Sequence, residues 1–302
     1  MLAALPMQER AAFVREIETW FPVEGEVWRC VTASAAGREE AEVAVSGRAR
    51  GAASLVRRVS ATLRPEIASV GAEQVMVVLP HFQGRRMTCV VALHCHNSAG
   101  RRGGIEVWDP TASGDLVRSD GFYGGLNDFA RSSRWTRFSR GTGLPGITWL
   151  RQKPHIMDDV RFSPLFLRAV LAREHALALG LGIPIFRDDT LQHVLVLLTA
   201  LGCPAARALE VWVPDSHERL WLDHAVHDAG LETVGRSSRT TCLMRGEGVA
   251  GRAATTREPQ VWTSSDAHDP TDFEAARAGL TFGMALPIVQ GDATSAVLVL
   301  RS

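Results

Sequence analysis

An internal repeat limits the folds open to this chain more than any other feature of the sequence. The matched segments are IEVWDP at 105–110 with LEVWVP at 209–214, RSSR at 131–134 and 236–239, GTGLPG at 141–146 with GEGVAG at 246–251, and GIPIFRDDTLQHVLVLLTA at 182–200 with ALPIVQGDATSAVLVLRS at 285–302. Because these segments recur in the same order at nearly constant spacing, we interpret them as two copies of one structural unit.

A weaker third copy precedes the other two. The segment 77–94 fits the closing hairpin with Pro80 in register, and EVW at 26–28 matches the opening strand, which equates Trp28 with the tryptophans of the later copies. The interval between this tryptophan and the hairpin proline is shorter than in the later copies, so we expect the first copy to lack about one helix. The predicted domains are 1–100, a degenerate copy, 101–203 and 204–302.

The pattern within each copy favours an α+β fold with a central antiparallel sheet flanked by helices. Short β-branched or Leu-rich runs bounded by turn residues predict strands, and the paired runs around Gly84, Asp188 and Gly291 predict β-hairpins. In the middle copy, Ser163-Pro164 predicts a helix start, with Leu167, Val170 and Leu171 as its buried stripe.

The glycine string GTGLPG, repeated as GEGVAG, superficially matches a dinucleotide-binding fingerprint. Such a fingerprint requires a βαβ frame, whereas this string precedes segments that we interpret as strand-like, GITW and GRAA. Tight turns with positive φ are the better explanation for these glycines.

A tryptophan-containing opening strand, the G-x-G-L/V-x-G string, an Ala-rich helix and a closing G-I/L-P hairpin together resemble the GAF domain, a small sensory module. The resemblance covers about 104–200 and 205–302 well and is suggestive for 10–99. It implies a regulatory domain that binds a small molecule or dimerises. The Asn-Lys…Phe…Asp-Glu signature of cyclic-nucleotide binders is not found, and residues 150–180 and 252–283 contain no cysteine for bilin attachment.

Composition narrows the class of partner. Lys+Arg and Asp+Glu are balanced at 33 each, and no long run of one sign predicts a nucleic-acid or membrane surface. The first ten residues lack the features of a signal peptide. The five cysteines contain no CxxC pair, which argues against a disulfide scaffold or a cysteine zinc site. We therefore expect a cytoplasmic, reduced protein.

The middle copy carries the candidate ligand-binding residues. In domains of this resemblance, the segment before the hairpin walls the pocket between sheet and helices, and here it mixes aromatic and polar side chains. The candidates are Trp149, His155, Phe162, Phe166, Arg168 and Arg173. Arg168 or Arg173 would anchor the ligand if it is anionic. The last copy has alanines in this segment, so we expect the larger pocket in the middle domain.

Metal and acid–base chemistry receive less support from the sequence. His94 and His96 lie two apart on a strand and share a face, but no third ligand is apparent nearby, so we predict no metal site. Asp158 and Asp159 suggest a loop cap rather than acid–base catalysis, because the last copy has Thr263 and Ser264 at the matching positions.

The sequence therefore favours a non-enzymatic sensory or regulatory protein that binds a small molecule of unknown identity. An interaction scaffold with filled pockets is the alternative, and a thiol enzyme using Cys89 or Cys242 ranks last. No cofactor is identified, and a homodimer or a partner signalling protein is left open.

Overall fold

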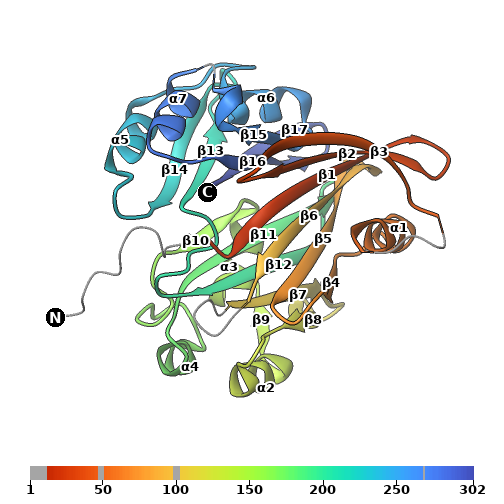
Figure 1. The fold of residues 1–302 in the computed structure, drawn as a ribbon. Helices are drawn as coiled ribbons and strands as arrows, with labels where there is room; N and C mark the ends of the chain where they lie inside the picture. The colour runs from red at the N-terminus through yellow and green to blue at the C-terminus, as the bar shows by residue number, and fades with distance from the viewer. Residues whose placement is uncertain (1–11, 47–50, 98–102, 268) are drawn as a thin grey trace.

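The computed structural model describes residues 12–46, 51–97, 103–267 and 269–302 and contains three antiparallel sheets (Figure 1). The first unit consists of β1 (Val14–Glu24), β2 (Val27–Ser34), β3 (Gly37–Ala44), α1 (Ala52–Thr62), β4 (Glu66–Ser69), β5 (Gln74–Gln83) and β6 (Arg86–His96). The middle unit consists of β7 (Gly103–Pro110), β8 (Asp115–Phe122), α2 (Asn127–Trp135), β9 (Arg137–Ser139), α3 (Gly143–Arg151), β10 (His155–Met157), α4 (Ala169–Glu174), β11 (Leu177–Arg187) and β12 (Thr190–Ala200). The last unit consists of β13 (Ala208–Pro214), β14 (Leu220–His227), α5 (Glu232–Thr240), α6 (Gly248–Thr256), β15 (Gln260–Thr263), the short 3-10 helix η2 (Ser264–Asp266), α7 (Pro270–Arg277), β16 (Phe282–Gln290) and β17 (Ala293–Arg301).

All three sheets have the same strand order. The orders are β3-β2-β1-β6-β5-β4, β9-β8-β7-β12-β11-β10 and β14-β13-β17-β16-β15, and an isolated bridge between Leu220 and Leu243 stands where the other units have a sixth strand. The predicted α+β class with central antiparallel sheets is thereby confirmed. The three predicted hairpins are also present, and Gly84, Asp188 and Gly291 adopt positive φ in their turns.

Strand register corrects the alignment of the first unit. Trp108 lies opposite Val194 and Trp212 opposite Val297, and the residue in the same position of the first sheet is Trp20, opposite Val90. Trp28 lies on the neighbouring strand β2, so equating it with the later tryptophans was wrong. The true repeat is Glu-x-Trp-x-Pro, which reads ETWFP at 18–22, EVWDP at 106–110 and EVWVP at 210–214.

The first unit retains one of the three helices. Helix α1 precedes β4 and packs on β5 and β6, as α3 packs on β11 and β12 and α6 on β16 and β17. All three of these helices end at a residue with positive φ, namely Leu63, Gln152 and Arg257. Among the described residues the first unit has no counterpart of α2 or α4, so its shortening removed two helices rather than about one.

The helices lie on the outside, and the opposite faces of the three sheets meet in one core. Figure 1 shows α5–α7 at the top, α1 at the right, and α2 and α4 at the bottom of the molecule. Along each opening strand, glutamate and tryptophan face the helices, while alternating residues such as Ile17, Ile105 and Leu209 face inward and belong to a single cluster shared by all three units. Two smaller clusters, one within the last unit and one within the first, lie apart from this shared core.

Contacts between the units follow a cyclic pattern. Strand β4 contacts β8, its counterpart β10 contacts β14, and its counterpart β15 contacts β2. Each unit thus presents the same edge to the next, which is the head-to-tail arrangement of a closed threefold ring, built here from one chain. Pro80, Pro184 and Pro287 line an apolar cavity of about 30 Å³ where the three hairpins meet.

Two local predictions need correction. GLPGITWLR and GVAGRAATT form the helices α3 and α6, not strands, because the glycines supply the turn before the helix and Pro145 is tolerated in a first turn. Helix α4 begins at Ala169 rather than near Ser163, and both Leu167 and Val170 are exposed instead of forming a buried stripe.

Candidate functional site

The helix-facing side of each sheet carries a buried glutamate bonded to the tryptophan two residues later. The indole Nε1 of Trp20, Trp108 and Trp212 donates to Glu18, Glu106 and Glu210 at 2.8, 3.0 and 3.0 Å. A buried carboxylate needs a cation or several donors to offset its lost hydration. The groups that compensate this glutamate differ among the units. They determine whether a ligand fits into the space between the sheet and its helices, called the sheet–helix space below.

In the middle unit the compensating cation is Arg168. Its guanidinium forms a two-pronged ion pair with Glu106 and also donates to Ser133, and Tyr123 donates to Glu106 at 2.8 Å. The charge and hydrogen bonds of Arg168 outweigh burial and lower the pKa of Glu106. Four aromatic rings surround the guanidinium at 4.5–5.6 Å, those of Trp108, Phe129, Phe138 and Phe166. The arginine itself thus occupies the space between sheet and helices.

In the last unit the cation comes from the closing strand instead. Arg301 of β17 contacts Glu210 at 3.1 Å and also pairs with Asp272 of α7, while His227 lies 3.0 Å from the other carboxylate oxygen of Glu210. Burial raises the pKa of Asp272 to about 6 despite the neighbouring Arg301. Glu210, Asp272 and Arg301 are buried, so this sheet–helix space is also filled by the chain's own side chains.

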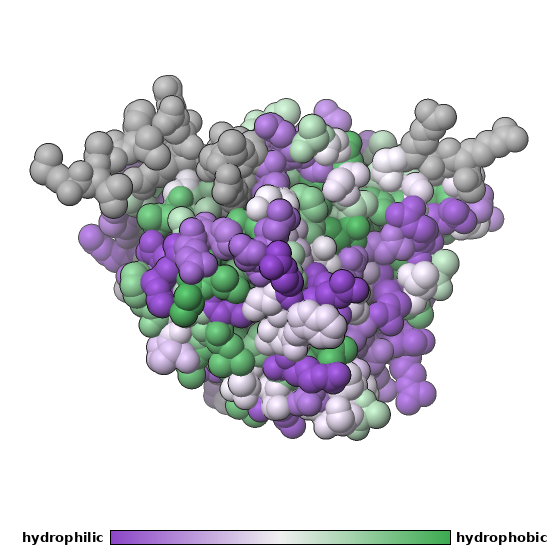
Figure 2. Space-filling view, turned by 90° about the horizontal axis from the view of Figure 1, so that it is seen from below, coloured by the Kyte–Doolittle hydropathy of each residue, from purple (hydrophilic) through white to green (hydrophobic). Residues whose placement is uncertain are grey.

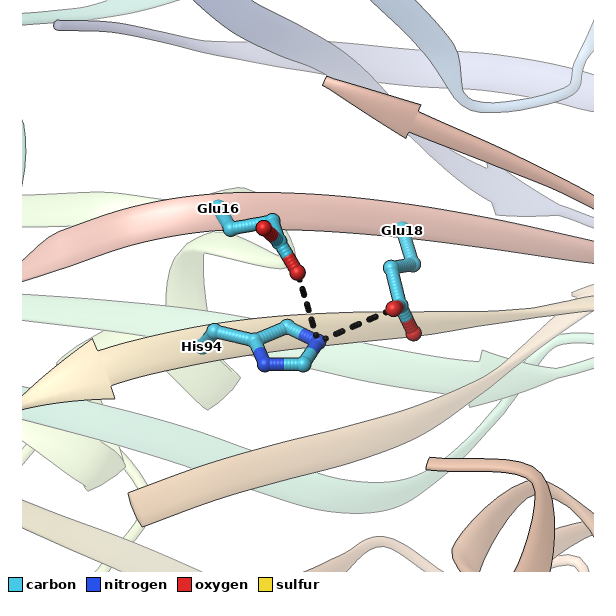
Figure 3. A group of neighbouring side chains, drawn as sticks. All are labelled: Glu16, Glu18 and His94. Carbon is cyan, nitrogen blue, oxygen red and sulfur yellow. Dashed lines mark ion pairs between the residues drawn. The ribbon is translucent and has the colours of Figure 1, made fainter. Parts of the chain in front are cut away.

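In the first unit the corresponding cation is a histidine. His94 of β6 lies opposite Glu16, at the register position that Leu198 and Arg301 occupy in the other sheets. Its Nε2 lies 3.2 Å from Glu18 and 3.5 Å from Glu16, and Figure 3 shows the three side chains on the same face of adjacent strands. Burial alone would lower the pKa of His94, but the two carboxylates outweigh burial and raise it.

The six residues singled out from the sequence fall into separate places. Phe166 and Arg168 lie together in the core, whereas Phe162 is 69% exposed, with the exposed Arg173 stacked over its ring at 6.0 Å. Trp149 packs against the core from α3. His155 of β10 is half-buried beside Arg151, and burial together with that arginine lowers its pKa to about 4. Sequence reasoning missed Glu106, which is the group that holds Arg168.

The glycine loops before α3 and α6 are folded back on their own helices. The amide of Gly141 donates to Gly146 at 2.7 Å, and the amide of Gly246 donates to Gly251 at 3.1 Å. Gly141, Gly143, Gly246 and Gly248 all have positive φ, as expected for tight turns. These two amides are therefore already engaged and do not point at an anion site. Asp159 caps its loop by accepting from the amide of Arg161.

Among known proteins, only solved structures show similarity to this chain. No family model matches the chain, and no curated protein is significantly similar to it. The GAF domain of a phosphoenolpyruvate-protein phosphotransferase from Coxiella burnetii is 24% identical over 32% of this chain and 56% of that one, with a TM-score of 0.27. A GAF domain/HD domain protein from Geobacter sulfurreducens is 14% identical over 32% and 61%, with a TM-score of 0.27. Free methionine-R-sulfoxide reductase from Neisseria meningitidis is 16% identical over 34% and 53%, with a TM-score of 0.26.

The chain thus spans a little over half the length of these structures. Among its described helices, none is long and apolar enough to cross a bilayer.

Proposed function

We propose that this chain is a non-enzymatic regulatory protein of three GAF-like units that acts as an interaction scaffold. The observation that carries the proposal is the filling of the sheet–helix space by Glu106 and Arg168 in the middle unit and by Glu210 and Arg301 in the last. A ligand entering either space would have to separate a buried ion pair, which costs several kcal/mol. The recurring Glu-x-Trp strand and hairpin support the GAF-like assignment.

The middle unit offers a surface for such contacts. Phe162, Leu165, Leu167 and Val170 are 56–69% exposed in and before α4, and Trp135 at the end of α2 is 79% exposed. Figure 2 shows the underside of the molecule, where α2 and α4 lie, with hydrophobic residues reaching the surface among hydrophilic ones. Clustered exposed apolar side chains are typical of protein interaction sites. The partner we propose is another protein with an apolar surface.

Four of the five thiols support a role without nucleophilic catalysis, and the fifth, Cys242, is half-buried. Cys30, Cys89, Cys95 and Cys203 are buried free thiols. Burial raises the pKa of Cys30 to about 12 and also raises that of Cys89, and a protonated thiol is a poor nucleophile. Free thiols suit a reducing compartment, which is why we place the protein in the cytoplasm.

Site-specific photo-crosslinking in the native host tests the scaffold. A crosslinker replacing Phe162 should capture one protein species, and the same crosslinker at Val23, which is 54% exposed on β1, should not. The captured protein, once purified, should bind the wild-type chain, and the Leu165→Ser/Val170→Ser variant should weaken that affinity at least tenfold. Equal capture at both positions, or unchanged affinity in the variant, would refute the proposal.

Small-molecule sensing is the second candidate, and a cleft in the last unit favours it. The cleft has a volume of about 710 Å³ and lies between α5 and α7, with Arg236, Phe273 and Glu274 among its lining residues. It belongs to the last unit, whereas the sequence led us to expect the larger pocket in the middle one. These side chains combine apolar area with opposite charges, as small-molecule sites do. Native mass spectrometry of freshly purified protein should show an added mass that disappears in Phe273→Ala if this candidate is right, and the bare chain if the scaffold is right.

A further inference from the structure

The first unit departs from the other two at one pair of facing positions. Where the middle sheet has Gly104 opposite Leu198 and the last has Ala208 opposite Arg301, the first has Glu16 opposite His94. The buried glutamate is common to all three units, so the first unit has gained a second carboxylate. It has also exchanged a permanent guanidinium for an imidazole, whose nitrogen is a metal ligand when neutral. The local charge is therefore more negative than in the middle unit, where Arg168 balances Glu106.

The spacing of these three groups fits a metal ion. Zinc bonds of about 2.0–2.1 Å in a tetrahedral site place neighbouring ligand atoms about 3.3 Å apart. His94 Nε2 lies 3.2 Å from Glu18 Oε1 and 3.5 Å from Glu16 Oε1, and one ligand atom from each residue falls within 4.8 Å of the others. Within the described part of the chain, this buried Nε2 atom makes no well-formed hydrogen bond. It faces the two carboxylates directly (Figure 3).

The surroundings hold the ligands in place and leave a route to solvent. Glu18 Oε2 accepts the indole proton of Trp20 at 2.8 Å, so its other oxygen is turned toward His94. Such outer contacts typically orient metal ligands. The side chains of Glu16 and His94 are 37% and 25% exposed. No counterpart of α2 or α4 lies among the residues of the first unit that the structure describes.

We propose that Glu16, Glu18 and His94 bind one divalent first-row metal ion, which replaces the arginine cation of the other units. An imidazole nitrogen with two carboxylate oxygens suits zinc or a neighbouring metal better than magnesium, which requires near-octahedral oxygen coordination. Three protein ligands leave a fourth position for water. From the sequence alone we expected no metal site, because His94 and His96 had no third ligand nearby, and the pairing of β1 with β6 supplies the missing carboxylates.

Calorimetric titration of the chelator-treated full chain with Zn²⁺ tests this site, with Co²⁺ visible absorption as a second readout. We expect one ion per chain, unaffected by excess Mg²⁺, and a rise in melting temperature on binding. Glu16→Gln and the double substitution Glu16→Ala/His94→Arg should each weaken Zn²⁺ binding at least tenfold. The double substitution copies the Ala208 and Arg301 pair, so it should fold without metal.

His96→Gln is the matched control, since His96 lies on the same strand but pairs with Glu73 instead. It should retain the wild-type affinity. Absence of saturable one-to-one binding, unchanged affinity in the double substitution, or loss of binding in His96→Gln would each overturn the assignment. If the double substitution fails to fold by circular dichroism, the half-exposed Glu16→Gln decides the question alone.

Discussion

At the scale of single residues, the chain satisfies one buried carboxylate in three ways. Glu106 is held by Arg168 from the segment before α4, Glu210 by Arg301 from β17, and Glu18 by the imidazole of His94. The glutamate and its tryptophan recur in all three units, but the cationic partner of the glutamate differs each time. We interpret the carboxylate as the group that organises the outer face of the sheet, and its cation as replaceable.

Moving the cation within the middle unit tests this interpretation. Arg168→Leu should lower the free energy of unfolding by about 3–5 kcal/mol, because Glu106 would stay buried without its cation. Adding Leu198→Arg places a guanidinium at the position of Arg301 and should recover part of that loss. Urea unfolding measures both effects, with the exposed Arg173→Leu as a control expected to change stability by less than about 0.5 kcal/mol. A second-site arginine that gives no recovery would contradict the interpretation.

His81 breaks the symmetry of the central cavity and should make stability depend on pH. It occupies the position of Ile185 and Ile288, and its ring nitrogens lie 3.2 Å from Thr88 Oγ1 and from the carbonyl oxygen of Pro287. The other residues lining the cavity are apolar. Burial lowers the pKa of His81 to about 4, against 6.5 ordinarily.

Because the folded state disfavours the charged ring, the unfolded chain binds the extra proton first as pH falls. Stability should be fully present above pH 6.5 and should decline by on the order of 3 kcal/mol as pH falls toward 4. Urea midpoints at pH 7.5, 5.5 and 4.5 would measure this decline. In His81→Ile the decline should be smaller, and an identical pH profile for both proteins would exclude His81 as its source.

At the scale of elements, the glycine loops show what a repeated motif encodes. Gly146 in α3 and Gly251 in α6 lie so close to the preceding loop that a Cβ would stand 2.2 Å from the Ser139 oxygen and 2.5 Å from the Met244 oxygen. Both oxygens belong to the backbone and cannot rotate away. The third glycine of the motif therefore serves close packing of helix against loop, and the first two serve the turn.

Alanine normally stabilises a helix relative to glycine, but at these two positions it should destabilise the fold. Glycine to alanine inside a helix ordinarily gains up to about 1 kcal/mol. Gly146→Ala and Gly251→Ala should instead destabilise the fold by on the order of 2 kcal/mol or more, as overpacking does. Gly125→Ala, where a Cβ meets nothing within 4 Å, is the control and should be close to neutral. Thermal melting of the three variants would distinguish these outcomes, and a stabilised Gly146→Ala would rule out the packing role.

Elements with a local signal were predictable, and those that depend on distant pairing were not. The hairpins carry their own turn residues, whereas α3 was mistaken for a strand because Gly143 and Pro145 are typical helix breakers away from a first turn. Trp20 and Trp28 both follow a glutamate by two residues, and the distinguishing signal was Pro22, matched by Pro110 and Pro214. The Glu16–His94 contact depends on pairing of β1 with β6, which no local pattern encodes.

At the scale of the whole molecule, the three units form a closed ring and not a string of domains. One hydrophobic cluster includes Ile17, Ile105 and Leu209 from the inner faces of the three opening strands. The edge of each unit covers the next, so removing any one unit would expose both of its neighbours. A sheet is also a single layer, so its inner face can be buried only against another layer. The surfaces left for partners are consequently the outer ones, on the helices and on the exposed edge strand β3.

This arrangement predicts that the chain unfolds in a single transition despite its length. Separate domains of about a hundred residues usually melt independently, but a shared core couples them. Differential scanning calorimetry should show one peak whose calorimetric and van't Hoff enthalpies agree, at on the order of 200 kcal/mol if melting occurs near 60 °C. His81→Ile, at the centre of the ring, should shift that peak as a whole. Two or three resolved peaks, or a van't Hoff enthalpy near a third of the calorimetric value, would show that the units are independent and that the ring does not govern stability.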